Sequence, residues 1–416
     1  MQSKEQFCNL IFRAISRAAM AALAIAIVFT LTVVLAQSAQ SQTFKVIYNF
    51  TGGGDGEYPY AGLTMDRAGN LYGTAAYGGG GGGTAFKLSH RSSGWALNPL
   101  HSFAGGSDGA NPYAGVVFGP DGSLYGTTYS GGGGDGGTVF NLKPPAAACK
   151  TALCPWTETV LYGLANPGLG DLIFDQADNL YGTTLGGGLN SYGTAYKLAP
   201  SDGGWTGSIL YSFTGGGDGA LPYAGLIFDR VGNLYGTTYS GGSRWGTVFQ
   251  LTPSGSGWTE TVLYNFQNGG DGRFPTAGLI FDPSGNLYGS TSDGGSGCCG
   301  TIFELTPSGG SWTYSLVYSF TGTEYDQCGP WGTLVMDAAG NLYGTTNCDG
   351  ANGDGNIFKL TPGGGGWTYT DLYDFTGGSD GVYPHGNVVF DANGNLYGTA
   401  PYGGAYGKGV VWEITP

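Results

Sequence analysis

The chain has 416 residues, of which 84 are glycine, and its formal net charge at pH 7 is −14. This negative surface would repel nucleic-acid phosphates and no basic cluster interrupts it, so nucleic acid is excluded as a partner. The glycines follow no collagen-like triplet and hydrophobic residues make up 41% of the chain. The composition therefore excludes both a collagen and a disordered chain.

Residues 1–36 are predicted to be a secretory signal peptide. Three basic residues precede an almost wholly apolar run from Ala18 to Ala36, and small residues close that run before polar Gln37. An uncleaved membrane anchor is the alternative, because a run of about 19 apolar residues could just span a bilayer. After cleavage we expect no membrane span, a short linker at residues 37–43, and a secreted, cell-surface or periplasmic protein.

One phrase, Asn-Leu-Tyr-Gly-Thr or a close variant, recurs seven times in the rest of the chain. The copies begin at Asn70, Ser123, Asn179, Asn233, Asn286, Asn341 and Asn395. Successive copies are therefore 53 to 56 residues apart, and this near-constant period indicates a repeat architecture.

Each repeat contains four short apolar runs. In one unit they are Gly225–Asp229, Asn233–Thr238, Gly246–Leu251 and Trp258–Phe266, bounded by Gly, Pro, Asn or Ser. These lengths and compositions predict four strands, here called a, b, c and d, and four strands per repeat predict the blade of a β-propeller. Six tryptophans open strand d and are expected to pack at the outer edge of the blades: Trp95, Trp156, Trp205, Trp258, Trp312 and Trp367.

The two ends of the repeat region complement each other. Residues 44–50 match strand d, whereas the chain closes on residues 409–414, which match strand c. We therefore predict an all-β fold, a seven-bladed β-propeller of four-stranded antiparallel blades, as a single domain over residues 44–416. The N-terminal strand would complete the last blade and remove exposed sheet edges. An open array of sheets is the alternative.

An aspartate ends strand a in six repeats: Asp66, Asp175, Asp229, Asp282, Asp337 and Asp391. In most copies a glycine three residues later and an asparagine four residues later give this segment the look of a calcium loop. An Asx turn, in which the carboxylate accepts backbone N–H groups, explains the pattern better, because one turn supplies one carboxylate and calcium binds six to eight oxygens.

Strand alternation places the d–a and b–c loops on one face of the ring. These loops are long and glycine-rich, and the sequence predicts that any ligand binds there, near the central channel. The candidate ligand-binding residues are Tyr60, Tyr77, Tyr113, Tyr129, Tyr223, Tyr239, Tyr402, Asp55, Asp108, Asp218, Asp271 and Asp380. The structural alternative is that the tyrosines pack the blade tops and the aspartates cap turns. Repeats three and six depart from the common loop pattern, and such asymmetry would help to build a specific site.

Six cysteines follow the leader, and an even number in an exported chain favours disulfides. Cys328 and Cys348 fall in loops of one blade on the same face, so we predict that they pair. Cys149 and Cys154 share one c–d connection and are expected to form a short staple. Cys298 and Cys299 would then form a vicinal disulfide or remain two thiols. The spacing of cysteines and histidines predicts no metal site.

The repeated unit Gly-Leu-Ile-Phe-Asp-x-x-Gly-Asn-Leu-Tyr-Gly-Thr-Thr, with Gly-Thr-Val-Phe-x-Leu-Thr-Pro after it, resembles the GloVer-type tandem-repeat family of exported bacterial proteins. The match covers about residues 44–416. It implies a secreted or surface-displayed repeat protein, and no activity comes with it. A looser similarity to propeller lactonases of the gluconolactonase type and to streptogramin lyases supports the fold, because their metal-binding residues have no counterpart placed here.

The leading hypothesis is a non-enzymatic binding or interaction propeller that recognises glycan or a surface polymer, and we expect a monomer. The alternative is an extracellular lyase or hydrolase, lactonase-like, with its site at the mouth of the central channel. No cofactor is expected, and calcium is left open. Acids that converge on one centre would favour the enzyme, whereas scattered acids that cap turns would favour the binder.

Overall fold

The computed structural model describes residues 42–146, 154–255, 257–297, 299–322 and 328–416, and Phe44–Thr415 form one compact unit. The predicted signal peptide at residues 1–36, Cys149 and Cys298 lie outside the described residues. No helix within these described ranges is both long and apolar enough to cross a membrane.

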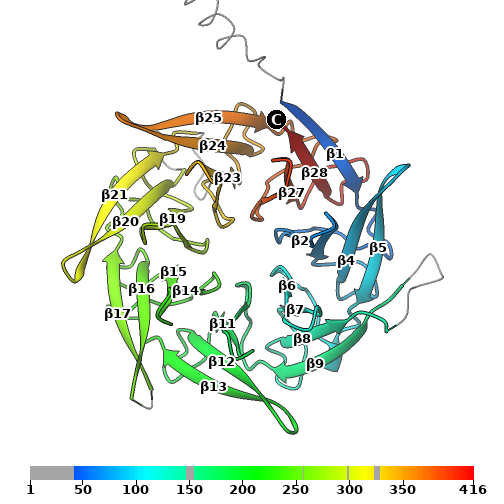
Figure 1. The fold of residues 1–416 in the computed structure, drawn as a ribbon, viewed down its shortest axis with the longest axis horizontal. Coiled ribbons are helices and arrows are strands. Elements are labelled where there is room, and N and C mark those ends of the chain that lie inside the picture. The colour runs from blue at the N-terminus through cyan, green and yellow to red at the C-terminus, as the bar shows by residue number, and fades with distance from the viewer. Residues whose placement is uncertain (1–41, 147–153, 256, 298, 323–327) are drawn as a thin grey trace, which may run out of the picture. The chain divides into compact units, whose positions relative to one another are not determined.

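Seven four-stranded antiparallel sheets stand in a ring, so the chain is a seven-bladed β-propeller, as predicted (Figure 1). Each blade runs outward from its first strand, which lies nearest the axis. The first three blades are β2 (Thr64–Met65), β3 (Leu71–Ala75), β4 (Thr84–Arg91), β5 (Gly94–Ser102); β6 (Val117–Phe118), β7 (Leu124–Thr127), β8 (Thr138–Lys143), β9 (Thr157–Gly163); and β10 (Ile173–Phe174), β11 (Leu180–Thr184), β12 (Thr194–Ser201), β13 (Gly204–Ser212).

The next three blades are β14 (Ile227–Phe228), β15 (Leu234–Thr238), β16 (Thr247–Ser254), β17 (Gly257–Asn265); β18 (Ile280–Phe281), β19 (Leu287–Thr291), β20 (Thr301–Ser308), β21 (Ser311–Ser319); and β22 (Val335–Met336), β23 (Leu342–Thr346), β24 (Asn356–Gly363), β25 (Gly366–Asp374). The last blade is β26 (Val389–Phe390), β27 (Leu396–Ala400), β28 (Val410–Thr415) and the N-terminal strand β1 (Thr43–Asn49). A one-turn 3₁₀ helix, η1 (Gly106–Asp108), lies in the second d–a loop along the chain, between β5 and β6.

The ring closes as the phase of the termini predicts. β1 pairs with β28 at the outer edge of the seventh blade, and Phe50 N–H donates to Gly409 O at 3.0 Å (Figure 1). The boundaries of the strands differ from the prediction at strands a and c. The a strands are two residues long, not five: in the fourth blade only Ile227 and Phe228 pair with β15. Strand c is longer than predicted, since β16 continues past Leu251 to Ser254.

Each position of the repeated phrase has a structural task, which β15 illustrates. Leu234 is fully buried, and the Gly236 backbone lies under the Phe249 ring, since a Cβ there would be 2.7 Å from Phe249 Cζ. Thr237 Oγ1 donates to Ala277 O in the next blade at 3.1 Å. The phrase therefore holds its own blade together and also holds the neighbouring blade in place.

Aromatic side chains fill the seams between blades. In most seams a phenylalanine at the end of one d strand packs on a phenylalanine of the next c strand, as Phe213 does on Phe249 with ring centroids 5.0 Å apart. The six tryptophans of strand d each contact a tyrosine of the preceding blade, as Trp258 contacts Tyr181. They are therefore seam packing, in line with the predicted structural role.

The seam between the second and third blades departs from this pattern. Leu164 and Tyr196 occupy the two phenylalanine positions there, and both are buried. The smaller Leu164 side chain lines a cavity of about 420 Å³.

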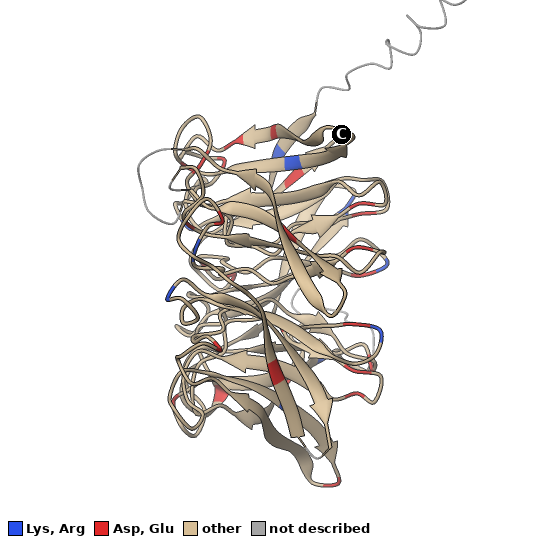
Figure 2. Cartoon of the chain, turned by 90° about the vertical axis from the view of Figure 1, so that its left-hand side faces the viewer, with Lys and Arg blue, Asp and Glu red and all other residues tan. Residues whose placement is uncertain are grey.

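The acidic turns are Asx turns. Asp229 Oδ1 accepts the N–H groups of Val231 and Asn233, both at 2.9 Å, and Asp229 Oδ2 accepts the Asn233 amide at 2.7 Å. The same three bonds recur at Asp66, Asp175, Asp282, Asp337 and Asp391. Figure 2 shows that many acidic residues lie in the loops at the two faces of the ring.

The predicted pairing of Cys328 with Cys348 is confirmed, and this disulfide joins the d–a and b–c loops of the sixth blade. Cys154 is disulfide-bonded, and its predicted partner Cys149 lies outside the described residues. Cys299 is buried, and the fate predicted for it together with Cys298 stays a prediction.

Candidate functional site at the mouth of the central cavity

The d–a and b–c loops of each blade meet on one face of the ring. Short backbone bridges join the two loops, as Glu57 joins Tyr77 and Ala220 joins Ser240. Beyond these bridges the chain turns into the channel at a proline, and the residue before the proline has a positive φ in five blades: Tyr58, Asn111, Leu221, Phe274 and Tyr383.

This backbone is sparsely populated for residues other than glycine, so the surroundings must hold it in place. Leu221 shows how: its N–H donates to Tyr192 O of the preceding blade at 2.8 Å, and its carbonyl accepts the Tyr239 N–H at 3.0 Å. Each loop is therefore aimed at the channel by bonds within its own blade and to its neighbour.

Seven three-residue segments, one from each blade, then line a central cavity of about 560 Å³. We call them the channel triplets: Tyr60-Ala61-Gly62, Tyr113-Ala114-Gly115, Leu169-Gly170-Asp171, Tyr223-Ala224-Gly225, Thr276-Ala277-Gly278, Trp331-Gly332-Thr333 and His385-Gly386-Asn387. The threonine of the repeated phrase anchors most of them by a bond to the middle residue, and Thr399 closes the circle by donating to Ala61 O at 2.8 Å.

The first residues of the triplets form an aromatic rim, defined as Tyr60, Tyr113, Tyr223, Trp331 and His385. The Trp331 and His385 ring centroids are 5.0 Å apart, His385 is 5.4 Å from Tyr60, and Tyr60 is 5.3 Å from Tyr113. This part of the rim is therefore one continuous row of rings over four successive blades.

Burial lowers the pKa of His385 to about 4, so this imidazole is neutral at pH 7. Burial also raises the pKa of Tyr60 well above its usual value, with help from the hydroxyl pair that Tyr60 forms with Tyr402. The aromatic rim is therefore uncharged near neutral pH.

The structure divides the predicted tyrosines into two groups. Tyr60, Tyr113 and Tyr223 line the central cavity. The b–c loop tyrosines pack behind them: Tyr77, Tyr129, Tyr239 and Tyr402. Tyr77 and Tyr129 keep 37% and 38% of their surface exposed, and a role of this outer group in binding stays a prediction.

The predicted loop aspartates bind their own turns. Asp218 Oδ2 accepts the Thr214 N–H at 2.8 Å and the Tyr211 hydroxyl at 3.0 Å. Equivalent bonds to backbone N–H groups and to a strand-d side chain hold Asp55, Asp108, Asp271 and Asp380. The carboxylates are therefore scattered around the loops and satisfied within them, and binding by them stays a prediction.

The sequence reasoning missed three polar residues of the cavity: Asp171, Thr333 and Asn387. They occupy the third position of their triplets, where the other four blades have glycine. Alignment of the seven repeats at this position would have shown the difference, since two of the three belong to the aberrant third and sixth repeats.

Two of these side chains tie their blade to a glycine of the preceding blade. Asp171 Oδ1 accepts the Gly115 N–H at 2.7 Å, and Thr333 Oγ1 accepts the Gly278 N–H at 3.0 Å. The Asp171 side chain is exposed to the central cavity. The protein that surrounds the cavity nevertheless desolvates its carboxyl group, and this raises the pKa of that group despite the bond from Gly115.

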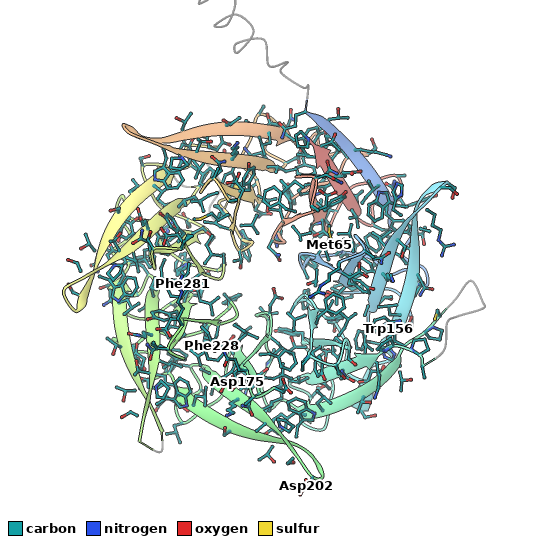
Figure 3. The ribbon with its side chains drawn as sticks, in the orientation of Figure 1. Met65, Trp156, Asp175, Asp202, Phe228 and Phe281 are labelled. Carbon is teal, nitrogen blue, oxygen red and sulfur yellow. A yellow bond between two sulfur atoms is a disulfide. The ribbon has the colours of Figure 1, made fainter. Side chains whose placement is uncertain are left out.

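In Figure 3, Met65, Phe228 and Phe281 lie on the innermost strands, and their side chains pack against the buried clusters between blades, whereas Asp202 lies at an outer hairpin tip. Among the described residues, no group of three or more His, Cys, Asp or Glu side chains is placed to hold a metal ion. Calcium binding by the loops stays untested.

Comparison with known proteins gives a fold and a family. An ancestral GH74 enzyme is similar in structure, with 13% identity and a TM-score of 0.54 over 86% of this chain, which spans 48% of that enzyme. A Bacteroides uniformis protein named as a 6-phosphogluconolactonase has 14% identity and a TM-score of 0.50, with 85% of this chain and 99% of that one covered. Such identities show the fold alone.

No curated protein matches the chain in sequence. The Gloeobacter/Verrucomicrobia repeat family, by contrast, matches residues 27–164, 157–328 and 243–416. Because these matches together span nearly the whole chain, the protein belongs to the Gloeobacter/Verrucomicrobia repeat family.

Proposed function

We propose that this protein is an exported binding propeller that holds a saccharide segment at the mouth of its central cavity. The observation that carries the proposal is the aromatic rim. Five aromatic side chains from five blades face one cavity whose volume, about 560 Å³, lies within the range of ligand sites. Tyrosine and tryptophan offer rigid, amphipathic contact area at low entropy cost, which suits the apolar faces and polar edges of sugar rings.

The polar groups of the cavity are few and fixed, as a specific site requires. Asp171 and Thr333 are each held by a glycine N–H of the neighbouring blade, so their positions are set before a ligand arrives. The ring of blades supports them rigidly, and this preorganisation lowers the entropic cost of binding.

The loop aspartates also favour binding over catalysis. Their oxygens accept hydrogen bonds inside their own turns, which is the scattered arrangement expected of a binder. Hydrolysis of the bound saccharide is the alternative function. It would need a second carboxyl group near Asp171, because glycoside hydrolases of both stereochemical classes use a pair.

The disulfide between Cys328 and Cys348 supports export, because such bonds persist in oxidising compartments. It also links the two loops beside Trp331 of the aromatic rim, so formation of this disulfide would restrict the motion of one wall of the site.

The test is a titration calorimetry panel of neutral, acidic and amino oligosaccharides on the chain without residues 1–36. Trp331→Ala and Tyr113→Ala should each weaken binding by about 10-fold or more, a hot-spot loss. Tyr406→Ala is the matched control, because this tyrosine is 62% exposed and lies in a b–c loop away from the cavity lining. Absence of binding across the panel, or equal losses in the control, would overturn the proposal. Product formation in the same samples would favour the hydrolase.

A further inference from the structure

The cavity carries one unbalanced charge. Asp171 is the only carboxylate among the described residues that line it, and neither lysine nor arginine lies in that lining. His385 is neutral at pH 7 because burial lowers its pKa to about 4. A ligand in this cavity therefore meets a single negative group with no cationic partner on the protein side.

The charge of Asp171 exceeds what the fold requires at this position. Thr333 makes the same bond to a glycine N–H with an uncharged hydroxyl group. Four other blades have glycine here and make no side-chain bond at all. Within the described residues, the second carboxylate oxygen of Asp171 accepts no hydrogen bond, so it is available to a ligand.

Asp171 lies where aromatic rings flank it on both sides. Its own triplet has Leu169 at the rim position, and the neighbouring blades present Tyr113 and Tyr223. The third residue of a triplet lies roughly 6–7 Å farther along the extended chain than the first. A sugar ring on the rim could therefore extend a substituent down to this carboxylate.

We propose that the saccharide taken by this cavity bears free amino groups, one of which binds Asp171 below the aromatic rim. An ammonium group would satisfy the free carboxylate oxygen by a charge-assisted hydrogen bond. The faces of Tyr113 and Tyr223 also attract cations. This inference rests on the proposed function and names the substrate class of the same site.

The Asp171 side chain is exposed to the cavity, and the surrounding protein raises the pKa of its carboxyl group despite the bond from Gly115. A bound ammonium group would favour the ionised carboxylate through a charge-assisted hydrogen bond.

The test compares glucosamine oligomers with N-acetylglucosamine oligomers of equal length by calorimetry, at a pH below the pKa of the amine. The two probes share ring and linkage and differ in charge. The wild type should bind the free-amine oligomer about 10-fold or more tightly. Asp171→Thr should abolish the preference. The threonine hydroxyl group should keep the bond to the Gly115 N–H, because Thr333 makes the equivalent bond in its own triplet. Asp171→Asn, which introduces the uncharged side chain that Asn387 has in its own triplet, is the second variant if the first does not melt like the wild type.

Equal affinity of the wild type for both probes would overturn the amino-group inference and leave saccharide binding intact. A preference that survives both Asp171 variants would overturn the assignment to this residue. Binding of no oligosaccharide by the wild type would overturn the proposed function as well, so the two failures are distinguishable.

Discussion

Phe44 stacks face to face on Tyr373, with ring centroids 3.7 Å apart and an interplanar angle of 5°. Phe44 belongs to β1, which completes the seventh blade, whereas Tyr373 belongs to β25 of the sixth. The N-terminal strand thus supplies hydrogen bonds to one blade and an aromatic contact to the next. Ring closure therefore depends on side-chain packing as well as on strand pairing.

Loss of this stack should weaken the closure. Phe44→Ala should lower the free energy of unfolding by about 1–3 kcal/mol, below the usual cost for a fully buried phenylalanine because Phe44 is half-buried. Lys45→Ala, on an exposed neighbour in the same strand, should change it little. Denaturant titration gives both values, and equal effects would contradict the role assigned to the stack.

Deletion of residues 44–50 should have a larger effect. It would expose β28 as an unpaired edge, which invites association with other chains. We expect aggregation or the loss of a cooperative melting transition, measured by calorimetry and size-exclusion chromatography. A monomer that melts like the full chain would show that the ring closes without β1.

The Asx turns should contribute to stability in a pH-dependent way. Burial alone would raise the pKa of Asp229, but bonds from Asn233, Val231 and Tyr235 together lower it below its usual value. The stability from this turn is present above the unfolded pKa near 4 and is lost as pH falls through the lower folded pKa. Asp229→Ala should cost about 1–3 kcal/mol at neutral pH.

The control for this turn is Asp202→Ala, at an exposed hairpin tip (Figure 3). It should leave the denaturation midpoint unchanged across the same pH range. If Asp229→Ala matched this control at pH 7, the turn would contribute no net stability.

Two glutamates in the seams between blades should make the fold less stable as pH rises, which is opposite to the effect of the Asx turns. Burial, together with Asp218 of the neighbouring blade, raises the pKa of Glu260 to about 7, and burial beside Asp108 does the same for Glu158. The folded state favours the protonated form of Glu260. Its contribution to the stability of the fold is therefore fully present below the unfolded pKa of about 4.5 and is lost as pH rises through 7. Glu260→Gln should raise the melting temperature above pH 7 and leave it unchanged below pH 4.5. Parallel pH profiles of variant and wild type would contradict this account.

The disulfide should stabilise the sixth blade. Reduction of the bond between Cys328 and Cys348, or its removal by a double change to alanine, should cost about 2–4 kcal/mol. Cys328 is fully buried in the core of this blade, so part of the loss in the double variant would be packing. Peptide mapping without reductant checks the pairing. A melting temperature that does not change when reductant is added would refute the stabilising role.

The blade pattern was predictable because it is local. In the unit of residues 225–266 the predicted ends of strands b and d are right to within one residue, whereas strand a is shorter and strand c longer than predicted. The pairing of Cys328 with Cys348 also followed, since strand alternation alone places both loops on one face. The Asx turns followed from the spacing of Asp, Gly and Asn, which is set within five residues.

The site was predictable only in part. The sequence placed ligand binding on the loop face and named Tyr60, Tyr113 and Tyr223, which line the cavity. It gave the same weight to the b–c tyrosines, such as Tyr129, which pack in a second layer. A period of about 54 residues shows which residues are equivalent, but it does not show how far each lies from the axis.

The sequence by itself therefore determined the number of blades, the closure by the first strand and the shared loop face, because period, phase and strand alternation can be read along the chain without knowledge of which residues meet in space. Only the tertiary structure decided that Asp171, Thr333 and Asn387 share one cavity with the aromatic rim. The physical reason is distance along the chain. The channel triplets are separated by some fifty residues each, and they meet only where seven blades pack around one axis.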